Sequence, residues 1–541
     1  MQRSWIVALA ALLAGLAAGL AHPPFGLLPG LLAYGAILRL GDGAPSRRAA
    51  FFRGWMAGLG YFAVGVWWVV EAFLVDAATY GWMAPFALVL LASGLALFWG
   101  AGLMLYRLAA PSGPLRVLVF AGALSLMEWL RGTLFTGFPW NLPGETWRAG
   151  SAPSQLAAFV GAYGLTWITL ALAAAPALVF DPGSRRRRAT VLAVTVVAAA
   201  GLYGAGAWRL DHAAPMAGPT PRLRIVQANI DQKDKWRPEN LPQVFAAYVG
   251  LTTGPAAVRP DIVIWPEGAL PAVIDDLLAA DSPYAAGLAA ALAPGQALLM
   301  GANRAEYGPG GKTLYFNSLI AFRRAPDGLR VTGVYDKHRL VPFGEYLPLG
   351  QAATKLGLRS LVHMPEDFSH GPAPAPISPQ GLPPVQPLIC YEALFPGFTS
   401  QAVRRGAARP SWIVNVSNDA WFGPTSGPLQ HLNLASYRAI EEGLPIVRAT
   451  PTGVSAVIDA HGRILPDGRL RLEVAGIIDA DLPARLQPTL YSRFGEVAFA
   501  CMLLVSVLIL GATRRCGRES QRSLAKRRSR KITGRTHAER T

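Results

Sequence analysis

The sequence predicts two kinds of structure in one chain, a membrane-embedded block of about eight α-helices and a layered α/β domain. Of its 541 residues, 52% are hydrophobic and only 15% are charged, which is too apolar for a soluble protein of this length. The apolar residues are concentrated before residue 208 and again after residue 493. Between these limits the composition is mixed, as in a globular domain of ordinary size.

These observations divide the chain into four parts. They are a seven-helix transmembrane block at 1–210, a soluble domain at 211–488, a C-terminal transmembrane helix at 489–513 and a basic tail at 514–541. A spanning helix needs about 20 mostly apolar residues. The stretches that meet or approach this length are 5–20, 25–40, 54–74, 83–105, 114–130, 157–180, 190–208 and 497–512.

The first apolar stretch has the hydrophobicity of a signal peptide. A second apolar segment follows it after only His22-Pro23-Pro24, and no cleavage site lies between them. We therefore expect the first stretch to be retained as a helix.

The formal net charge of +17 is unevenly placed along the chain. Eleven Lys and Arg residues lie in the tail, and four consecutive arginines at 185–188 separate two apolar segments. The basic loops fall on alternate sides of the eight segments, which the positive-inside rule assigns to the cytoplasm. The soluble domain is then expected on the outer side, the periplasm of a bacterium with two membranes. Such charges suit anionic lipid headgroups better than DNA, so we expect no nucleic-acid partner.

Short apolar runs with high β-propensity predict the strands of the soluble domain. They are 223–227, 262–265, 298–302, 313–322, 388–390, 412–416, 446–449 and 454–459. Continuous apolar strands separated by helical stretches indicate sheets that are covered on both faces. Functional groups are then expected at the ends of strands.

Three predicted strand ends carry residues that suit catalysis. Glu267 follows an apolar strand and a proline, Lys337 follows Val334-Tyr335-Asp336, and Cys390 ends the run Pro387-Leu388-Ile389. Taken alone, Cys390 is more typical of a small core residue, and an exposed Glu or Lys at the start of a loop is usually a solvated charge. The three together, each just past an apolar run, favour a catalytic site.

The residue types fit nucleophilic catalysis. A thiolate is the nucleophilic form of cysteine, so a carboxylate such as Glu267 is needed to take the proton from Cys390. Attack on a carbonyl produces an oxyanion, which the ammonium of Lys337 would stabilise, and Glu345 could hold that lysine in place. No spacing in the sequence matches a zinc site or a phosphate-binding loop, so we expect neither a metal nor another cofactor.

The motifs resemble those of a known superfamily. Trp265-Pro266-Glu267, the run from Asp336 to Tyr346, and Cys390-Tyr391-Glu392 are similar to the Glu-Lys-Cys motifs of the nitrilase, or carbon-nitrogen hydrolase, superfamily. With the loop Phe138-Pro139-Trp140-Asn141 and the apolar helices, residues 5–512 resemble the apolipoprotein N-acyltransferase family.

The resemblance implies a monomeric, multi-pass enzyme of the bacterial inner membrane whose periplasmic domain is an α-β-β-α sandwich. The implied reaction transfers a fatty acyl chain from a membrane phospholipid to the N-terminal amino group of a diacylglyceryl-cysteine apolipoprotein. It would pass through a thioester on Cys390, with Glu267 as base and Lys337 as oxyanion stabiliser.

The resemblance also implies a set of supporting or substrate-contacting residues. They are Asn317, Glu345, Tyr391, Glu392, Trp236 and Trp421. Glu345 and Glu392 would be supporting carboxylates, and Asn317 would lie near the lysine. For Trp236 and Trp421 a packing role is at least as common as a place at a substrate entrance.

Two other functions fit part of the sequence. A membrane-tethered amidase would use the same three residues with water as acceptor, but seven helices are excessive for a tether. A transporter with an accessory domain would explain the helices but not the three residues. We also expect a lid at 347–368, where apolar and polar residues alternate and Pro348, Gly350 and Gly357 interrupt the chain.

Overall fold

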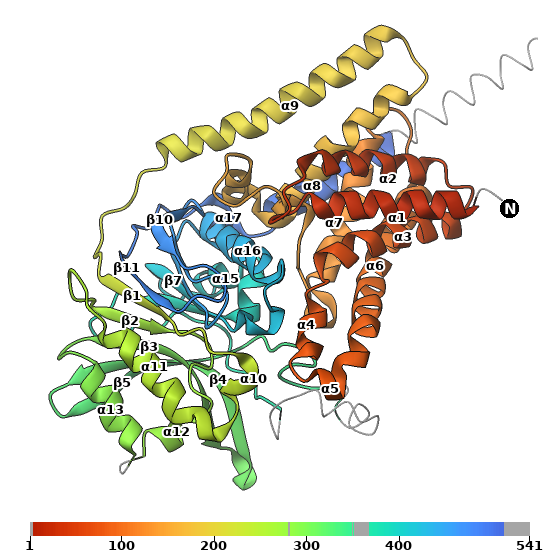
Figure 1. The fold of residues 1–541 in the computed structure, drawn as a ribbon. Coiled ribbons are helices and arrows are strands. Elements are labelled where there is room, and N and C mark those ends of the chain that lie inside the picture. Colours follow the sequence, from red (N-terminus) through yellow and green to blue (C-terminus); the bar gives the residue numbers. More distant parts are fainter. Residues whose placement is uncertain (1–3, 280–281, 349, 351–366, 513–541) are drawn as a thin grey trace, which may run out of the picture.

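The computed structural model describes residues 4–279, 282–348, 350 and 367–512. Figure 1 shows a helical block beside an α/β domain, with a long helix running along the outside of the molecule from the first to the second. The helices of the block are α1 (Ser4–Leu20), α2 (Ala33–Asp42), α3 (Arg47–Gly65), α4 (Val69–Leu74), α5 (Ala77–Tyr80), α6 (Ala84–Ala109), α7 (Arg116–Arg131), α8 (Ala157–Ala174) and α9 (Arg185–His212).

Small residues let the helices of the block approach closely. A Cβ atom on Gly15 of α1 would lie 1.7 Å from the carbonyl oxygen of Ala57 in α3, and one on Gly60 would lie 2.2 Å from that of Leu12. Contacts of this kind are typical of helix pairs in membranes, where close packing replaces the hydrophobic effect.

The structure does not confirm the predicted count of eight spanning helices. Three described segments are long and apolar enough to cross a membrane: Ala77–Ala109, Pro153–Phe180 and Arg185–His212. Two shorter apolar helices are Ser4–Leu20 and Val497–Ala512.

The other expected spans are interrupted or fall below these limits of length and hydropathy. The stretch predicted at 54–74 is divided between α3 and α4 at Val66, which leaves helical geometry, and the Trp68 indole donates to the carbonyl oxygen of Gly65 at 3.1 Å. The stretch at 25–40 begins with the 3-10 helix η1 (Leu28–Leu32), which contains Pro29, a residue without a backbone N–H.

The α/β domain contains two sheets. The six-stranded sheet has the order β11-β1-β2-β3-β4-β5, and the five-stranded sheet has the order β10-β9-β8-β7-β6. The strands of the first sheet are β1 (Arg222–Gln227), β2 (Ile262–Trp265), β3 (Ala297–Tyr307), β4 (Thr313–Ala325), β5 (Gly328–Asp336) and β11 (Gly476–Asp481). Those of the second are β6 (Val385–Ile389), β7 (Trp412–Val416), β8 (Ile446–Ala449), β9 (Ala456–Ile458) and β10 (Ile464–Arg469).

The sheets form the two inner layers of an α-β-β-α sandwich, as the resemblance implies. A core that includes Ile264 of β2 and Val414 of β7 lies between them. The helices α11 (Leu241–Thr253), α12 (Ile274–Leu277) and α13 (Pro283–Ala291) cover the first sheet. The helices α15 (Phe398–Arg404) and α16 (Gly427–Glu442) cover the second and also face the helical block.

All eight predicted apolar runs lie in or overlap strands. The strands β5, β10 and β11 were not predicted, because none of them has a continuous buried run. In β5, for example, the residues are mostly half-buried or exposed, as expected for a strand at the edge of a sheet.

Buried polar contacts fix the α/β domain on the helical block. Arg438 of α16 forms an ion pair at 3.2 Å with Glu145, which lies in the 3-10 helix η4 (Pro143–Thr146) between α7 and α8. The Tyr437 hydroxyl donates to the carbonyl oxygen of Gly144 at 3.1 Å, and the Trp140 indole donates to Gln430 at 3.0 Å. The loop between α7 and α8 of the helical block therefore packs directly against the α/β domain.

Candidate active site

Cys390 lies at a sharp turn between β6 and the 3-10 helix η10 (Cys390–Leu394). Its φ of +48° is in the left-handed region, which few non-glycine residues occupy and which is often found at functional sites. The side chain is half-buried at the edge of the core between the sheets. The prediction that this residue ends an apolar strand and turns at once is confirmed.

Glu267 and Lys337 form a buried ion pair close to this turn. The Lys337 ammonium lies 3.2 Å from Oε1 of Glu267 and 3.0 Å from Oε1 of Glu345. Asn317 of β4 donates from its amide nitrogen to the same two oxygens at 2.7 Å each. The structure thus brings together four residues that are far apart in the sequence.

The second oxygen of Glu267 is held by a residue that the sequence analysis did not identify. The backbone N–H of Asn418 donates to Glu267 Oε2 at 2.6 Å. Asn418 is the second residue after β7, so the polar run Ser417-Asn418-Asp419 after an apolar strand was the available signal. Both oxygens of the carboxylate are therefore fixed in direction.

The environment keeps Cys390 protonated and Lys337 charged. Burial raises the pKa of the Cys390 thiol to about 12, the negative charge of Glu267 adds to this effect, and Lys337 opposes it. Burial alone would lower the pKa of Lys337, but Glu267 and Glu345 outweigh it and raise that pKa above its usual value. The thiol must lose its proton to a base before it can act as a nucleophile.

Glu392 connects the loops that carry Cys390 and Lys337. Its carboxylate accepts hydrogen bonds from the backbone N–H of Ile389 at 2.9 Å, the backbone N–H of His338 at 2.8 Å and the hydroxyl of Tyr335 at 2.9 Å. Burial raises the pKa of Glu392 to about 7, although the backbone donors oppose this effect. Its carboxylate therefore joins the loop of Cys390 to the loop of Lys337 through backbone contacts.

A second buried network lies behind Cys390 and was also missed from the sequence. Asp419 pairs with Arg448 at 2.6 Å and with Nδ1 of His431 at 3.0 Å, and Nε2 of His431 lies 3.3 Å from the backbone oxygen of Cys390. Burial alone would raise the pKa of Asp419, but Arg448 and His431 hold it well below its usual value. Asp419, His431 and Arg448 belong to three separate elements, so no local sequence motif predicts that they form a network.

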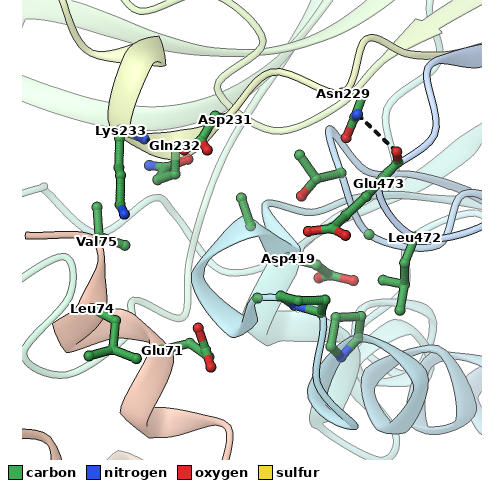
Figure 2. Close-up of a pocket in the computed structure, with 16 residues that line it drawn as sticks. Glu71, Leu74, Val75, Asn229, Asp231, Gln232, Lys233, Asp419, Leu472 and Glu473 are labelled. Atoms are coloured by element: carbon green, nitrogen blue, oxygen red, sulfur yellow. Dashed lines mark hydrogen bonds between the residues drawn. The ribbon is translucent and has the colours of Figure 1, made fainter. Parts of the chain in front are cut away.

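A pocket of about 380 Å³ lies at the junction of the helical block and the α/β domain. Figure 2 shows Glu71 and Leu74 of α4 and the following residue, Val75, on one wall, with Gln232 across from them. The pocket is also lined by Asp419. Neither Glu267 nor Cys390 lines the pocket, which adjoins the site through Asp419 of the network behind Cys390.

Comparisons with known proteins cover most of the chain. Residues 14–175 match the family model of the apolipoprotein N-acyltransferase N-terminal domain, and residues 222–491 match that of carbon-nitrogen hydrolases. An apolipoprotein N-acyltransferase of Caulobacter vibrioides is 56% identical over 95% of this chain and 96% of its own length. The chain belongs to the apolipoprotein N-acyltransferase family. Proteins of the same name from Rhodopseudomonas palustris (41% identity; 94% of this chain and 95% of the relative) and Brucella melitensis (39%; 90% and 92%) also match along most of their length.

Membership of the apolipoprotein N-acyltransferase family makes the chain an acyltransferase with a nitrilase-like domain. Its relatives are bacterial, and its long apolar helices suit a membrane enzyme. The carbon-nitrogen hydrolase match covers Glu267, Lys337 and Cys390, the three residues that the structure gathers around one site.

Three aromatic residues were expected at the site of this acyltransferase, and they lie on or next to three different elements. Tyr391 is buried, and its ring stacks on Phe138 with 6.4 Å between ring centroids. Trp236 is half-buried at the end of the short helix α10 (Gln232–Lys235). Trp421 is half-buried on the 3-10 helix η11 (Asp419–Phe422). Substrate contact by these residues stays a prediction, and the predicted lid at 347–368 lies almost wholly outside the described residues.

Proposed function

We propose that this chain transfers a fatty acyl chain from a membrane phospholipid to the N-terminal amino group of a diacylglyceryl-cysteine apolipoprotein. The acyl chain is held between the two steps as a thioester on Cys390. The observation that carries the proposal is the placement of Cys390 on a strained turn within electrostatic range of the Glu267–Lys337 ion pair. The relatives that match the whole chain support the nature of the donor and acceptor.

In the first step, Glu267 takes the proton from the Cys390 thiol as the sulfur attacks the ester carbonyl of the phospholipid. Because the pKa of the thiol is about 12, proton removal must accompany the attack. Lys337 stabilises the tetrahedral oxyanion. The ester C–O bond then breaks, and the proton held by Glu267 passes to the leaving oxygen of the lysophospholipid.

In the second step, the acceptor amine attacks the thioester carbonyl and forms an amide. Glu267 takes the proton released by the amine, the C–S bond breaks, and the same proton passes from Glu267 to the departing sulfur, which restores the Cys390 thiol. A thioester suits this step because an amine attacks it more readily than it attacks an oxygen ester. Exclusion of water by the buried site limits hydrolysis.

Glu345 and Asn317 are proposed to hold the Lys337 ammonium in place, and the contacts around Lys337 support this role. Glu345 contacts the ammonium directly, and Asn317 bridges Glu345 to Glu267. These two residues hold the cation where the oxyanion develops. No step of this mechanism uses a metal or an organic cofactor.

We place the enzyme in the inner membrane with its α/β domain in the periplasm, where it acts as a monomer. The support is the alternation of basic loops along the sequence. Labelling of single cysteines introduced at exposed positions of the α/β domain, in intact cells, tests this orientation. A domain that is labelled only after the inner membrane is opened would contradict it.

The decisive experiment follows the thioester. Purified protein is incubated with phospholipid without acceptor, and intact mass and lysophospholipid are measured together. We expect one acyl adduct on Cys390 with one equivalent of lysophospholipid released, and adduct loss when a diacylglyceryl-cysteine peptide is added. Continuous lysophospholipid release without acceptor would instead support a hydrolase. Release that requires the acceptor, with no adduct on Cys390, would favour direct transfer.

A further inference from the structure

A second lysine is buried near Glu267 without an assigned role. Lys235, the last residue of α10, is 1% exposed. Within the described part of the chain its ammonium has no hydrogen-bond partner. The ring of Trp236 lies beneath it, with 5.5 Å between the ammonium nitrogen and the ring centroid.

Two more buried donors on the same turn also lack an acceptor among the described residues. They are Nε2 of Gln232 and Nε1 of Trp236. The amide oxygen of Gln232 is already occupied, because it accepts from the side chain of Asn418 at 3.3 Å. The NH₂ group of Gln232 is therefore the part of its side chain that lacks a hydrogen-bond partner among the described residues.

These three donors lie next to the proposed catalytic base. A Cβ atom on Gly268, the residue after Glu267, would lie 3.6 Å from the Lys235 ammonium. Asn418 links the two groups, since its backbone N–H donates to Glu267 and its side chain donates to Gln232. The charge of Glu267 also acts on Lys235.

An unpaired buried ammonium destabilises the folded state, because it loses the hydration that it has in water. Burial lowers the pKa of Lys235 to about 8, and Glu267 offsets part of this effect. Three unpaired donors on one turn are more than packing requires. Buried donors without a partner call for an explanation, and a bound ligand that supplies the missing acceptors is one.

We propose that Lys235, Gln232 and Trp236 bind the phosphodiester of the acyl donor. The inference rests on the proposed function, in which the donor is a phospholipid. A phosphodiester carries one negative charge over two non-bridging oxygens, which matches one cation and two neutral N–H groups. A carbonyl group offers a single uncharged oxygen and would leave donors unpaired.

The connectivity of a phospholipid agrees with the position of the three donors. The phosphate and the reacting ester are attached to the same glycerol unit, so they are separated by only a few bonds. A phosphate held beside Glu267 therefore places that ester near the thiol that Glu267 deprotonates. The site would orient the donor and would distinguish phospholipids from other acyl esters.

The test compares two acyl donors on the full-length protein in detergent. Single-turnover acylation of Cys390 is measured with dioleoyl phosphatidylglycerol and with p-nitrophenyl palmitate, an acyl ester without phosphate. We expect Lys235→Met to slow acylation by the phospholipid by about 10- to 100-fold, the range for loss of a hydrogen bond to a charged group. The rate of acylation by p-nitrophenyl palmitate should change by less than about 2-fold, because this ester has no phosphate to accept hydrogen bonds from the three donors.

Two further variants sharpen the comparison. Trp236→Phe keeps the ring and removes only the N–H, so we expect a smaller loss, about 3- to 10-fold, with the phospholipid alone. Arg237→Met is the control, because Arg237 is an exposed cation one residue further on, with 62% of its side chain accessible. Its rates with both donors should match those of the unsubstituted protein. The melting temperature of Lys235→Met should be equal or higher, because the substitution removes an unpaired buried charge.

Several results would overturn the inference. An equal loss with both donors would mean that Lys235 acts on Glu267 instead of on phosphate, and no loss with the phospholipid would remove the site. Normal acylation with impaired transfer to the peptide would assign the residues to the acceptor. A lower melting temperature for Lys235→Met would assign the lysine a structural role. Failure of the unsubstituted protein to form any adduct on Cys390 would overturn the proposed function itself, and the inference with it.

Discussion

The hydroxyl of Tyr391 donates a hydrogen bond to the backbone carbonyl oxygen of Gly137. Tyr391 follows Cys390 directly, whereas Gly137 belongs to the loop between α7 and α8 of the helical block. Gly137 has a φ of +84°, and a Cβ atom there would lie 2.2 Å from the carbonyl oxygen of Gly132, so only glycine fits this close turn of the loop. The helical block therefore helps to brace, that is, to hold in position, the turn that carries Cys390.

Tyr391→Phe tests this brace. The substitution keeps the ring that stacks on Phe138 and removes only the hydrogen bond. We expect the acylation rate to fall about 3- to 10-fold while the protein stays folded, because a neutral hydrogen bond contributes about 1 kcal/mol. Tyr391→Leu, which also removes the stacking, should cost more. Equal rates for Tyr391→Phe and the unsubstituted enzyme would show that the hydrogen bond does not position the nucleophile.

Cys390→Ala should abolish both the acyl adduct and the transfer. Cys390→Ser should be almost inactive as well, because a carboxylate is too weak a base for a serine hydroxyl. Both variants are small changes at a half-buried position, so their melting temperatures should stay close to that of the unsubstituted protein. Cys501, exposed on the helix Val497–Ala512, provides the matched control. Transfer by Cys390→Ala at an ordinary rate would exclude the thioester.

Glu345→Gln removes one of the two carboxylates that contact the Lys337 ammonium. The side chain keeps its size and an oxygen that can accept from the N–H of Val341, so the loop should retain its shape. We expect the acylation rate to fall about 10- to 100-fold with little change in donor binding, because the missing contact is needed when the oxyanion develops. Glu306→Gln, at a carboxylate with 57% of its side chain exposed, is the control and should leave the rate unchanged. A rise in KM at constant kcat would instead assign Glu345 to substrate binding.

Site residues could be predicted from the sequence where their neighbours along the chain form a recognisable pattern. Glu267, Lys337 and Cys390 each come within two residues of the end of a strand, and the sequence placed all three at strand ends. Asn418 could not be identified in this way, because its function depends on the contact of its backbone N–H with a residue 151 positions away. Lys235 looks like a solvated residue in a charged stretch, and only the packing of α10 reveals that it is buried.

The number of spanning helices in the helical block could not be predicted from the sequence either. Hydropathy locates apolar segments, but it does not report where the backbone leaves helical geometry. The break between α3 and α4 depends on the conformation of Val66 and on the contact of Trp68 with Gly65, neither of which alters the apolar character of the stretch. Edge strand β5 was missed for the opposite reason, since its exposed face removes the apolar run on which the strand predictions relied.

The last prediction concerns the dependence of stability on pH. Glu442 of α16 is buried, and its carboxylate accepts a hydrogen bond from the backbone N–H of Ser400 at 3.2 Å. Burial raises the pKa of Glu442 from 4.5 to about 7, and the neighbouring Glu441 adds to the effect. Between pH 4.5 and 7 the folded protein therefore holds a proton that the unfolded chain has released.

The sign of the effect follows from this difference in bound protons. Since the folded state binds more protons than the unfolded state, the free energy of unfolding decreases as pH rises through this window and levels off above pH 7. Glu442→Gln removes this contribution, so its melting temperature should vary less between pH 4.5 and 7 and should exceed that of the unsubstituted protein at pH 7.5. Glu306→Gln should follow the unsubstituted curve, because Glu306 is exposed. Melting curves recorded in detergent across this range decide the matter: parallel curves for Glu442→Gln and the unsubstituted protein would show that Glu442 ionises alike in the folded and unfolded states.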